Sequence, residues 1–341
     1  MDWALTAAGF GVGIIVGLTG MGGGALMTPV LVIFFGIPPL AAVSSDLVAS
    51  AVMKPVGSLV HILRRRVNWS LVRWLCVGSV PAAFAGVLVN RALGDGDRLQ
   101  NAVQLALGIA LLLAAAGLVA RAYVRMRDHG RRRKAAMAGT PTPVRPDGAE
   151  STIRVRPLAT ALLGAAGGLV VGMTSVGSGS LIIVVLLGLY PTLRPGDVVG
   201  TDLVQAVPLV ASAAIGHILF GDFQFSITAA LLVGAIPGVF LGAQVSARVP
   251  GGFVRRALAV VLLASALKLL HASGVELIAG VAAAAVLGPV AWAWVRTRHG
   301  LPALARAERV PLTGALPAAP PRTRATATHE LSPADVVVDR G

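Results

Sequence analysis

The stretch Gly17-Leu18-Thr19-Gly20-Met21-Gly22-Gly23-Gly24 interrupts an apolar run that extends from Ala4 to Phe35. A second stretch, Gly172-Met173-Thr174-Ser175-Val176-Gly177-Ser178-Gly179-Ser180, interrupts the apolar run from Pro157 to Leu189. Runs of 32 and 33 residues fit two tilted or partial helices better than two full membrane crossings of about 20 residues each. The sequence therefore predicts two glycine-broken helical elements.

The two broken elements belong to an internal repeat. Their residues align at an offset of 155 positions, and the helices that follow align at an offset of 156. The matched pairs include Gly17 with Gly172, Thr19 with Thr174, Gly22 with Gly177, Gly24 with Gly179, Asp46 with Asp202, His61 with His217 and Pro81 with Pro237. Because chance rarely matches Asp, His, Pro and Gly at one register, the pattern predicts two related halves.

The composition is typical of a membrane protein. Of the 341 residues, 55% are hydrophobic and only 13% are charged, whereas soluble domains carry about 25% charged residues. Cys76 is the single cysteine, which excludes an internal disulfide. Further spans are expected at about Ala41–Leu63, Ser70–Val89, Asn101–Val124, Pro195–Phe220, Phe225–Ala247, Val254–Leu270 and Val275–Val295.

The distribution of positive charge predicts the orientation. The net charge of +14 lies in short segments between apolar runs, which is typical of cytoplasmic loops and argues against a nucleic-acid partner. Basic residues place the central linker in the cytoplasm, and the parity of the spans then puts Arg64-Arg65-Arg66 and Arg255-Arg256 on the same side. The first broken element would enter from outside and the second from inside. We therefore predict an all-α, polytopic membrane protein with two inverted-topology repeats, as in many secondary transporters.

The chain accordingly divides into four parts. Residues 1–124 are the first membrane repeat, 125–156 a basic cytoplasmic linker, and 157–295 the second repeat with one extra span. Residues 296–341 are a cytoplasmic tail rich in Pro, Ala, Arg and Thr, a composition that predicts disorder.

The broken elements are the candidate substrate site. Glycines leave backbone N–H groups accessible, and a half-helix that begins after the break points the positive end of its dipole into the membrane. With added hydroxyl donors, a small oxyanion could be bound between the two breaks. The alternative is that the glycines only allow close helix packing. The candidate residues are Thr19, Gly22, Gly23, Gly24, Thr174, Ser175, Gly177, Ser178, Gly179 and Ser180.

Ionisable and polar residues within the spans are candidates for coupling or gating. The two aspartates could accept protons or orient the glycine loops, or they could cap the helices that begin near them. The lysine shares a helix face with the first aspartate and could attract an anion. The two histidines could relay protons, or they could be ordinary residues at the membrane interface. The set consists of Asp46, Asp202, Lys54, Gln205, His61 and His217.

Motifs of other function classes are missing from the sequence. It contains no G-x-x-x-x-G-K-[ST] motif for ATP and no metal-ligand spacing of His, Cys and Asp. The string Ser175-Val176-Gly177-Ser178-Gly179 lacks the first glycine of a G-x-S-x-G nucleophile motif, and Gly23 stands in the register of Ser178. We therefore expect no catalytic residue, no metal and no cofactor, and a protein that is not an enzyme.

At these residues the sequence resembles the TauE/SafE family of sulfite and organosulfur-anion exporters. The likeness covers roughly residues 5–295 without the 125–156 linker. It rests on Gly20-Met21-Gly22-Gly23-Gly24, followed by Pro29 and Leu31, on the turn Ser44-Ser45-Asp46, and on the weaker copy of the motif at 172–181. The resemblance implies a multi-spanning inner-membrane protein that moves sulfite or related anions without ATP.

Together, the residues and the resemblance predict a secondary transporter of small anions, with sulfite or organosulfonate export as the candidate activity. Its expected partners are a small anionic substrate and the lipid bilayer of the cell (inner) membrane. An anion channel and a non-transporting membrane scaffold are the alternatives. The sequence leaves the anion, the direction, the coupling ion and the oligomeric state open.

Overall fold

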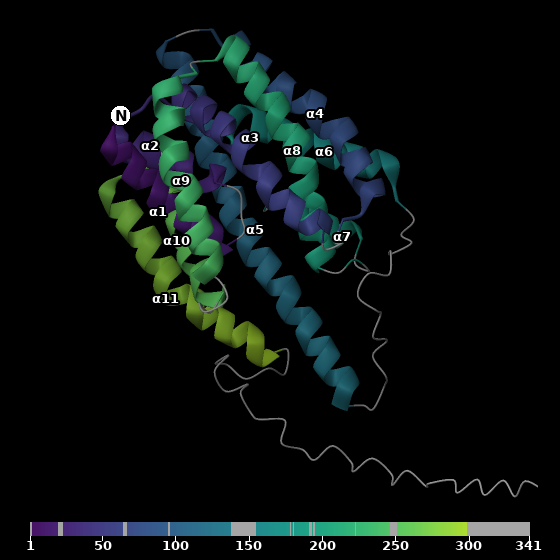
Figure 1. The fold of residues 1–341 in the computed structure, drawn as a ribbon. Helices are drawn as coiled ribbons and strands as arrows, with labels where there is room; N and C mark the ends of the chain where they lie inside the picture. Colours follow the sequence, from purple (N-terminus) through teal and green to yellow (C-terminus); the bar gives the residue numbers. More distant parts are fainter. Residues whose placement is uncertain are drawn as a thin grey trace, which may run out of the picture.

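The computed structural model describes residues 2–19, 23–63, 67–94, 96–137, 155–177, 179, 181–190, 193, 195–221, 223–245 and 251–298. These residues form α-helices with no strand among them (Figure 1). The helices are α1 (Trp3–Thr19), α2 (Gly24–Phe35), α3 (Pro39–Leu63), α4 (Trp69–Ala92), α5 (Asp97–Met137), α6 (Pro157–Thr174), α7 (Leu181–Leu189), α8 (Pro195–Phe220), α9 (Phe225–Val245), α10 (Gly251–Leu269) and α11 (Gly274–Arg298).

The structure confirms that both glycine-rich stretches break a helix. The first separates α1 from α2, and the second separates α6 from α7. Helix α2 has 12 residues and α7 has 9, which gives lengths of about 18 and 14 Å, well short of a hydrocarbon core of about 30 Å. Each broken element therefore consists of a longer helix followed by a partial one.

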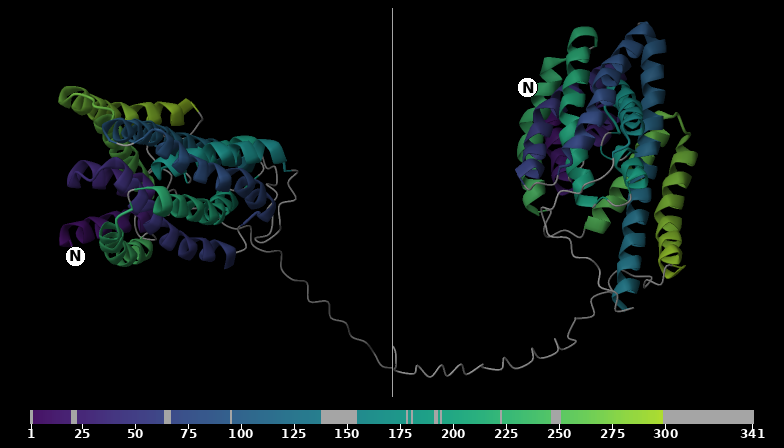
Figure 2. Two further views of the ribbon diagram at one scale, coloured as in Figure 1. Left: turned by 90° about the horizontal axis from the view of Figure 1, so that it is seen from above. Right: turned by 90° about the vertical axis from the view of Figure 1, so that its right-hand side faces the viewer.

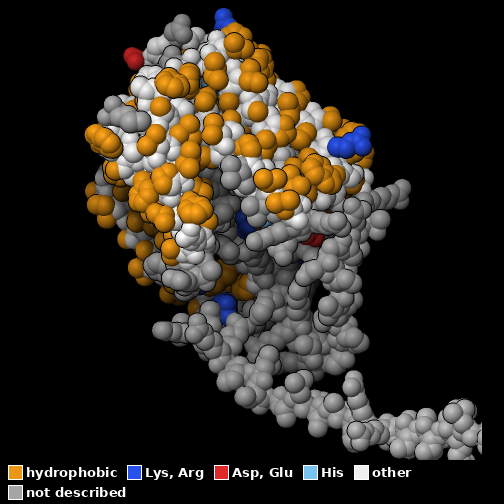
Figure 3. Space-filling view, viewed as in Figure 1, with side chains coloured by type: hydrophobic (Ala, Val, Ile, Leu, Met, Phe, Trp, Pro, Cys, Tyr) orange, Lys and Arg blue, Asp and Glu red, His pale blue; other side chains and the backbone are white. Residues whose placement is uncertain are grey.

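The surface and the helix lengths are those of a multi-pass membrane protein. Among the described residues, seven helices are long and apolar enough to cross a membrane, namely α3, α4, α5, α6, α8, α9 and α11. Hydrophobic side chains cover most of the helical surface in view (Figure 3). Helix α10, where the sequence predicts a span, is not among the seven, and it carries Arg255, Arg256 and Lys268.

Two helices near the predicted domain boundaries differ from expectation. Helix α5 continues to Met137, so residues 125–137 of the predicted linker are helical, because Arg, Lys, Ala and Met favour helix strongly. Helix α11 ends at Arg298, lies at the edge of the bundle and buries none of its residues (Figure 2). The rest of the linker to residue 154, and the tail from 299, lie outside the described residues.

Close backbone contact joins α1 to α9. The glycines of α1 on this face, Gly9, Gly13 and Gly17, are spaced four residues apart and lie against the backbone of α9. A Cβ atom on Gly13 would lie 2.6 Å from the carbonyl oxygen of Ala235. Glycines of α9 with the same spacing, Gly234, Gly238 and Gly242, lie against the backbone of α1 in return. Such interlocked small residues are typical of helix pairs in membranes.

The equivalent helices of the two halves form a second pair of this kind. Gly164, Gly168 and Gly172 of α6 lie against the backbone of Leu75, Ser79 and Ala83 in α4. In the repeat, α6 corresponds to α1 and α4 corresponds to α9. The first helix of each half therefore packs on the fourth helix of the other half, which interlocks the two halves.

The third helices of the two halves, α3 and α8, also contact each other. Ser44, near the start of α3, lies 2.8 Å from His217, near the end of α8. Lys54, further along α3, is attracted electrostatically by Asp202 near the start of α8. The two equivalent helices therefore run in opposite directions. An inverted repeat requires this relation, and the inversion across the membrane itself stays a prediction.

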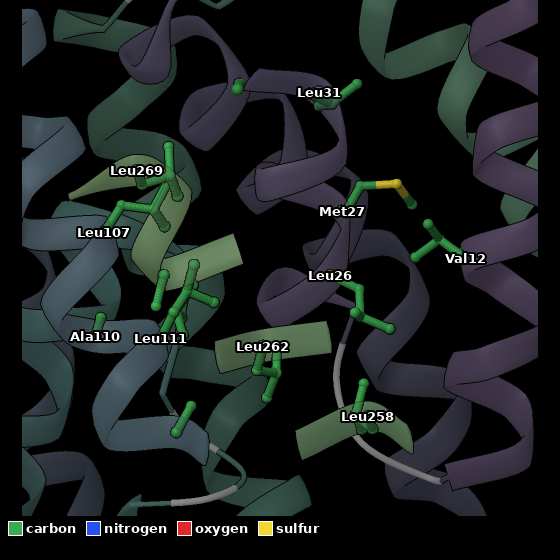
Figure 4. Close-up of a cluster of buried hydrophobic side chains, with 14 of the residues drawn as sticks. Val12, Leu26, Met27, Leu31, Leu107, Ala110, Leu111, Leu258, Leu262 and Leu269 are labelled. Carbon is green, nitrogen blue, oxygen red and sulfur yellow. The ribbon is translucent and has the colours of Figure 1, made fainter. Parts of the chain in front are cut away.

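The partial helix α2 is anchored inside the molecule. Its side chains Leu26, Met27 and Leu31 are buried. They belong to an apolar cluster that also contains Val12, Leu107, Leu111, Leu258 and Leu262 (Figure 4). Because α1, α5 and α10 contribute side chains to this cluster, α2 is held at a fixed place in the interior.

Candidate functional site

The two glycine breaks meet. Gly24 begins α2, and a Cβ atom placed on it would overlap the carbonyl oxygen of Ser175, which follows α6. Ser175 has a left-handed backbone conformation with φ of 61°. The hydroxyl of Thr174 stabilises this turn, because it donates to the carbonyl of Val170 at 2.6 Å and accepts from the N–H of Val176 at 3.2 Å. Segments about 150 residues apart in the sequence thus share one site.

Asp46 of α3 connects the two breaks. Its Oδ2 atom accepts hydrogen bonds from the hydroxyl of Thr28 in α2, at 2.8 Å, and from the hydroxyl of Ser175, at 2.6 Å. The side chain is fully buried, and its Oδ1 atom has no hydrogen-bond partner among the described residues. The carboxylate therefore holds both broken elements through one oxygen and keeps the other available.

Asp202, the repeat partner of Asp46, has different neighbours. The amide of Gln205 lies 3.5 Å from its Oδ1 atom, and the Gln205 oxygen accepts a hydrogen bond of 3.0 Å from Ser79 in α4. The cations Lys54 and Arg121 are attracted to Asp202, and Lys54 is also attracted, less strongly, to Asp46. The first carboxylate is therefore held by hydroxyls and the second lies among cations.

The structure rules out helix capping as the role of the aspartates. Asp46 follows the first residue of α3, Pro39, by seven positions, and Asp202 follows the first residue of α8, Pro195, also by seven. Both carboxylates are buried in the interior of their helices, two turns beyond the positions where a side chain can cap the helix.

The predicted hydroxyl donors are engaged within the protein in this conformation. Thr19 donates to the carbonyl of Ile15 at 2.8 Å, Thr174 stabilises its own turn, and Ser175 donates to Asp46. A bound anion would therefore receive these hydroxyl protons only after local rearrangement. Of the remaining candidates in the breaks, Gly22, Ser178 and Ser180 lie outside the described residues.

The other glycines of the breaks differ in whether the structure leaves room for a side chain. Gly24 has no room for a side chain, and Gly177 has φ of 124°, which other residues rarely adopt. Gly23 has helical backbone angles, and a Cβ there would lie 3.7 Å from the nearest atom, in Met53. A Cβ on Gly179 would lie 3.9 Å from Asp202. Gly23 and Gly179 therefore have room for a Cβ atom in ordinary van der Waals contact, whereas close packing explains Gly24.

The two histidines lie in different environments. His217 is fully buried and forms hydrogen bonds to Ser44 and to the backbone of Gly172. His61 is half-buried, two residues before the end of α3.

Four residues of this region have no place among the candidates predicted from the sequence. They are Thr28, Ser44, Ser79 and Arg121. Thr28, Ser44 and Ser79 are hydroxyl residues, and each is fully buried. The repeat does not duplicate any of the three, since Ile183, Gly200 and Ala235 stand in their registers. A hydroxyl residue that occurs in only one half was the sequence signal that could have found these three residues.

Comparison with known proteins places the chain in a family. The sequence model described as "Sulfite exporter TauE/SafE" matches residues 5–269, a range that includes both breaks. The probable membrane transporter protein YjnA of Bacillus subtilis (strain 168) is 32% identical over 272 residues, which are 79% of this chain and 100% of the relative. The probable membrane transporter protein YunE of the same organism is 33% identical over 87 residues, or 26% of this chain and 32% of the relative. No solved structure matches significantly. The chain belongs to the sulfite exporter TauE/SafE family.

Proposed function

We propose that this protein is a secondary transporter that moves a small anion across the cell membrane, without ATP, through the place where the two glycine breaks meet. The observation that carries the proposal is the group of buried charges beside the breaks, Asp46, Asp202 and Lys54. Charged side chains inside a membrane protein are costly and typically mark a substrate or ion pathway.

The cations beside Asp202 support an anionic substrate. Lys54 and Arg121 are attracted to this carboxylate from α3 and α5. An entering anion would compete with Asp202 for the two cations. The family description names sulfite, so sulfite and organosulfonates are the first candidates.

The opposite directions of α3 and α8 support transport by alternating access of two inverted halves. Basic residues support the orientation that we propose. They lie along α5 beyond Arg121 and at Arg296 and Arg298 near the end of α11, and an excess of Lys and Arg is typical of cytoplasmic segments, which favours a cytoplasmic central linker and C-terminal tail.

The substrate class is tested on the purified protein. We expect sulfite, thiosulfate or a sulfonate to raise the thermal unfolding temperature more than acetate does, since a ligand that binds only the native state stabilises it. The anion that gives the largest rise in unfolding temperature should then enter proteoliposomes that contain the protein faster than it enters protein-free liposomes. A protein that is stabilised by no anion and moves none would refute the transport proposal.

Lys54→Met should weaken anion binding at least tenfold, because the buried positive charge is lost. The same change leaves Asp202 with one cation fewer, and breaking a buried ion pair costs about 3–5 kcal/mol of stability. The double variant Lys54→Met/Asp202→Asn removes both charges and separates the two effects. We expect it to regain stability but not anion affinity, as measured by thermal shift and calorimetry. Because Asp202→Asn alone removes a competitor of the anion, the double variant is compared with it, and equal anion affinity in these two variants would exclude Lys54 from the anion site.

Gly23→Leu should block transport without unfolding the protein. The helical backbone and the 3.7 Å clearance to Met53 admit a Cβ atom, so Gly23→Ala is the control and should behave like wild type. The larger side chain would fill the space beside the break. Flux in proteoliposomes and elution in gel filtration measure the two properties. Normal flux through Gly23→Leu would show that this space is not part of the pathway.

A further inference from the structure

His217, near the end of α8, joins three helices through its ring. Its Nδ1 atom lies 2.8 Å from the hydroxyl oxygen of Ser44 in α3, and its Nε2 atom lies 2.8 Å from the carbonyl oxygen of Gly172 in α6. The Ser44 hydroxyl is also 2.8 Å from the carbonyl oxygen of Leu40, one turn earlier. A Cβ on Gly221 would lie 2.8 Å from both Nδ1 and the Ser44 oxygen, so the network is tightly enclosed.

Three hydrogen bonds at this place require three protons. The carbonyls of Gly172 and Leu40 can only accept, so Nε2 carries a proton and Ser44 gives its own proton to Leu40 when that bond forms. The bond between Nδ1 and Ser44 then needs a proton on Nδ1, which the ring has only in its charged form. With a neutral ring, the single Ser44 proton serves either Nδ1 or Leu40. One set of heavy-atom positions thus fits both protonation states, and the charged ring completes all three bonds.

Few charges face this network. From α4, the guanidinium of Arg91 lies 4.5 Å from the ring centre of Phe220, about one turn after His217. On α3, Asp46 follows Ser44 by two residues. Helices α6, α7 and α9 carry no ionisable residue, and the aspartates of α8 itself, Asp202 and Asp197, lie about four and about five and a half turns earlier.

We propose that His217 is the site that binds and releases the proton coupled to anion transport, a role that rests on the transport function proposed above. The proton binds to Nδ1 of the neutral ring. The Ser44 hydroxyl then turns its hydrogen from Nδ1 to Leu40, and Nε2 keeps its bond to Gly172. Release of the proton reverses these steps.

The position of the network links the proton to the substrate site. Gly172 lies two residues before Thr174, the last residue of α6, and Ser44 lies two residues before Asp46. Deprotonation returns the Ser44 hydrogen to Nδ1, so the bond that is lost is the one to Leu40, in the turn of α3 that leads to Asp46, while the ring keeps its bonds to α3 and α6. A change in charge at His217 is thus transmitted through a short segment of α3 to Asp46, which holds both breaks.

The repeat supplies a matched control. His61 stands in the register of His217, but Gly200 stands in the register of Ser44. The repeat therefore does not duplicate the serine of this network. His61→Gln changes the same residue type at the same register without touching the network.

The test is a pH titration of ¹⁵N-histidine NMR signals of the full chain in lipid nanodiscs. The His217 signals are assigned from their loss in His217→Gln or, if that variant does not fold, from a chain whose other five histidines are Gln. We expect protons on both ring nitrogens at the acid end and on Nε2 alone at the alkaline end. Ser44→Ala should shift the midpoint by about one pH unit or more. A ring that stays neutral wherever the protein is folded would overturn the proposal.

Coupling is tested in proteoliposomes that contain a pH-sensitive dye, with methanesulfonate, which does not titrate, as the probe. A methanesulfonate gradient should move protons through the wild type and through His61→Gln, whereas His217→Gln should lose proton movement and retain exchange of the anion. Unchanged proton movement in His217→Gln would refute the coupling role. A wild type that moves no anion but shows the NMR titration would refute the transport function and leave the proton site intact.

Discussion

Gly13→Val is expected to lower the stability of the protein by about 3 kcal/mol or more, because the new side chain forces α1 away from α9. Even a Cβ atom at this position would lie 2.6 Å from the carbonyl oxygen of Ala235, 3.0 Å from its Cα atom and 3.1 Å from the backbone nitrogen of Val239. These are backbone atoms, which cannot turn away as a flexible side chain could. The whole helix has to move, and with it the contact between the two halves.

Gly11→Val is the matched control, since Gly11 lies two residues earlier on the same helix and a Cβ there meets nothing within 4 Å. Both variants carry the same propensity penalty for valine in a helix. Gel filtration in mild detergent and the thermal unfolding temperature should therefore separate the effect of packing from that of composition. Equal stability of Gly13→Val and Gly11→Val would mean that the two helices are not in close contact.

The second helix pair extends the same prediction. Gly168 lies against the backbone of Ser79, whereas a Cβ atom on Gly188 of α7 would meet nothing within 4 Å. Gly168→Val should therefore resemble Gly13→Val, and Gly188→Val should resemble the control. If only one of the pairs proves sensitive, the halves would be joined by one contact rather than interlocked by two.

The sequence predicted the breaks well because glycine content and hydropathy are local properties. It could not separate the glycines by role. Gly17 and Gly24 lie in one motif, yet the first contacts α9 and the second contacts Ser175, more than 150 residues away. A glycine required by a neighbouring helix looks like a glycine that opens a site, since the difference lies in tertiary contacts.

The capping alternative for the two aspartates fails for a local reason. The capping interpretation depended on a helix that begins near Ser44, but Pro39 begins α3, and proline is favoured in the first turn of a helix. The partners of Asp46 could not be predicted at all. Ser175 lies 129 positions away in sequence, and only the folded chain brings its hydroxyl to the carboxylate.

The repeat predicted equivalent residues, whereas the structure shows how the two halves have diverged. Thr28 and Ser175 donate to Asp46, while Ile183 and Gly20 stand in their registers. Val210 likewise stands in the register of Lys54 in the repeat. The corresponding helices α3 and α8 thus hold two carboxylates of different character, so their replacement should have different consequences.

Asp46→Asn should reduce coupled anion transport by more than tenfold while the protein remains folded. The asparagine oxygen can still accept the hydrogen bonds from Thr28 and Ser175, so α2 and α6 stay attached to α3. The change removes the negative charge that attracts Lys54 and places an amide where the unpartnered Oδ1 atom was. Transport should slow because the negative charge is lost, whereas the free energy of unfolding should change by only about 1 kcal/mol.

Asp202→Asn should also reduce transport, but with an added effect on the substrate, because it removes a carboxylate that competes with the anion for Lys54 and Arg121. We expect tighter anion binding in thermal shift together with slower coupled flux. Asp197→Asn, in the first turn of the same helix α8, is the control and should transport like wild type. If flux in proteoliposomes is unchanged in both Asp46→Asn and Asp202→Asn, neither carboxylate takes part in coupling. The buried charges would then have a structural role only, because the cations would be retained to neutralise aspartates that hold the breaks in place.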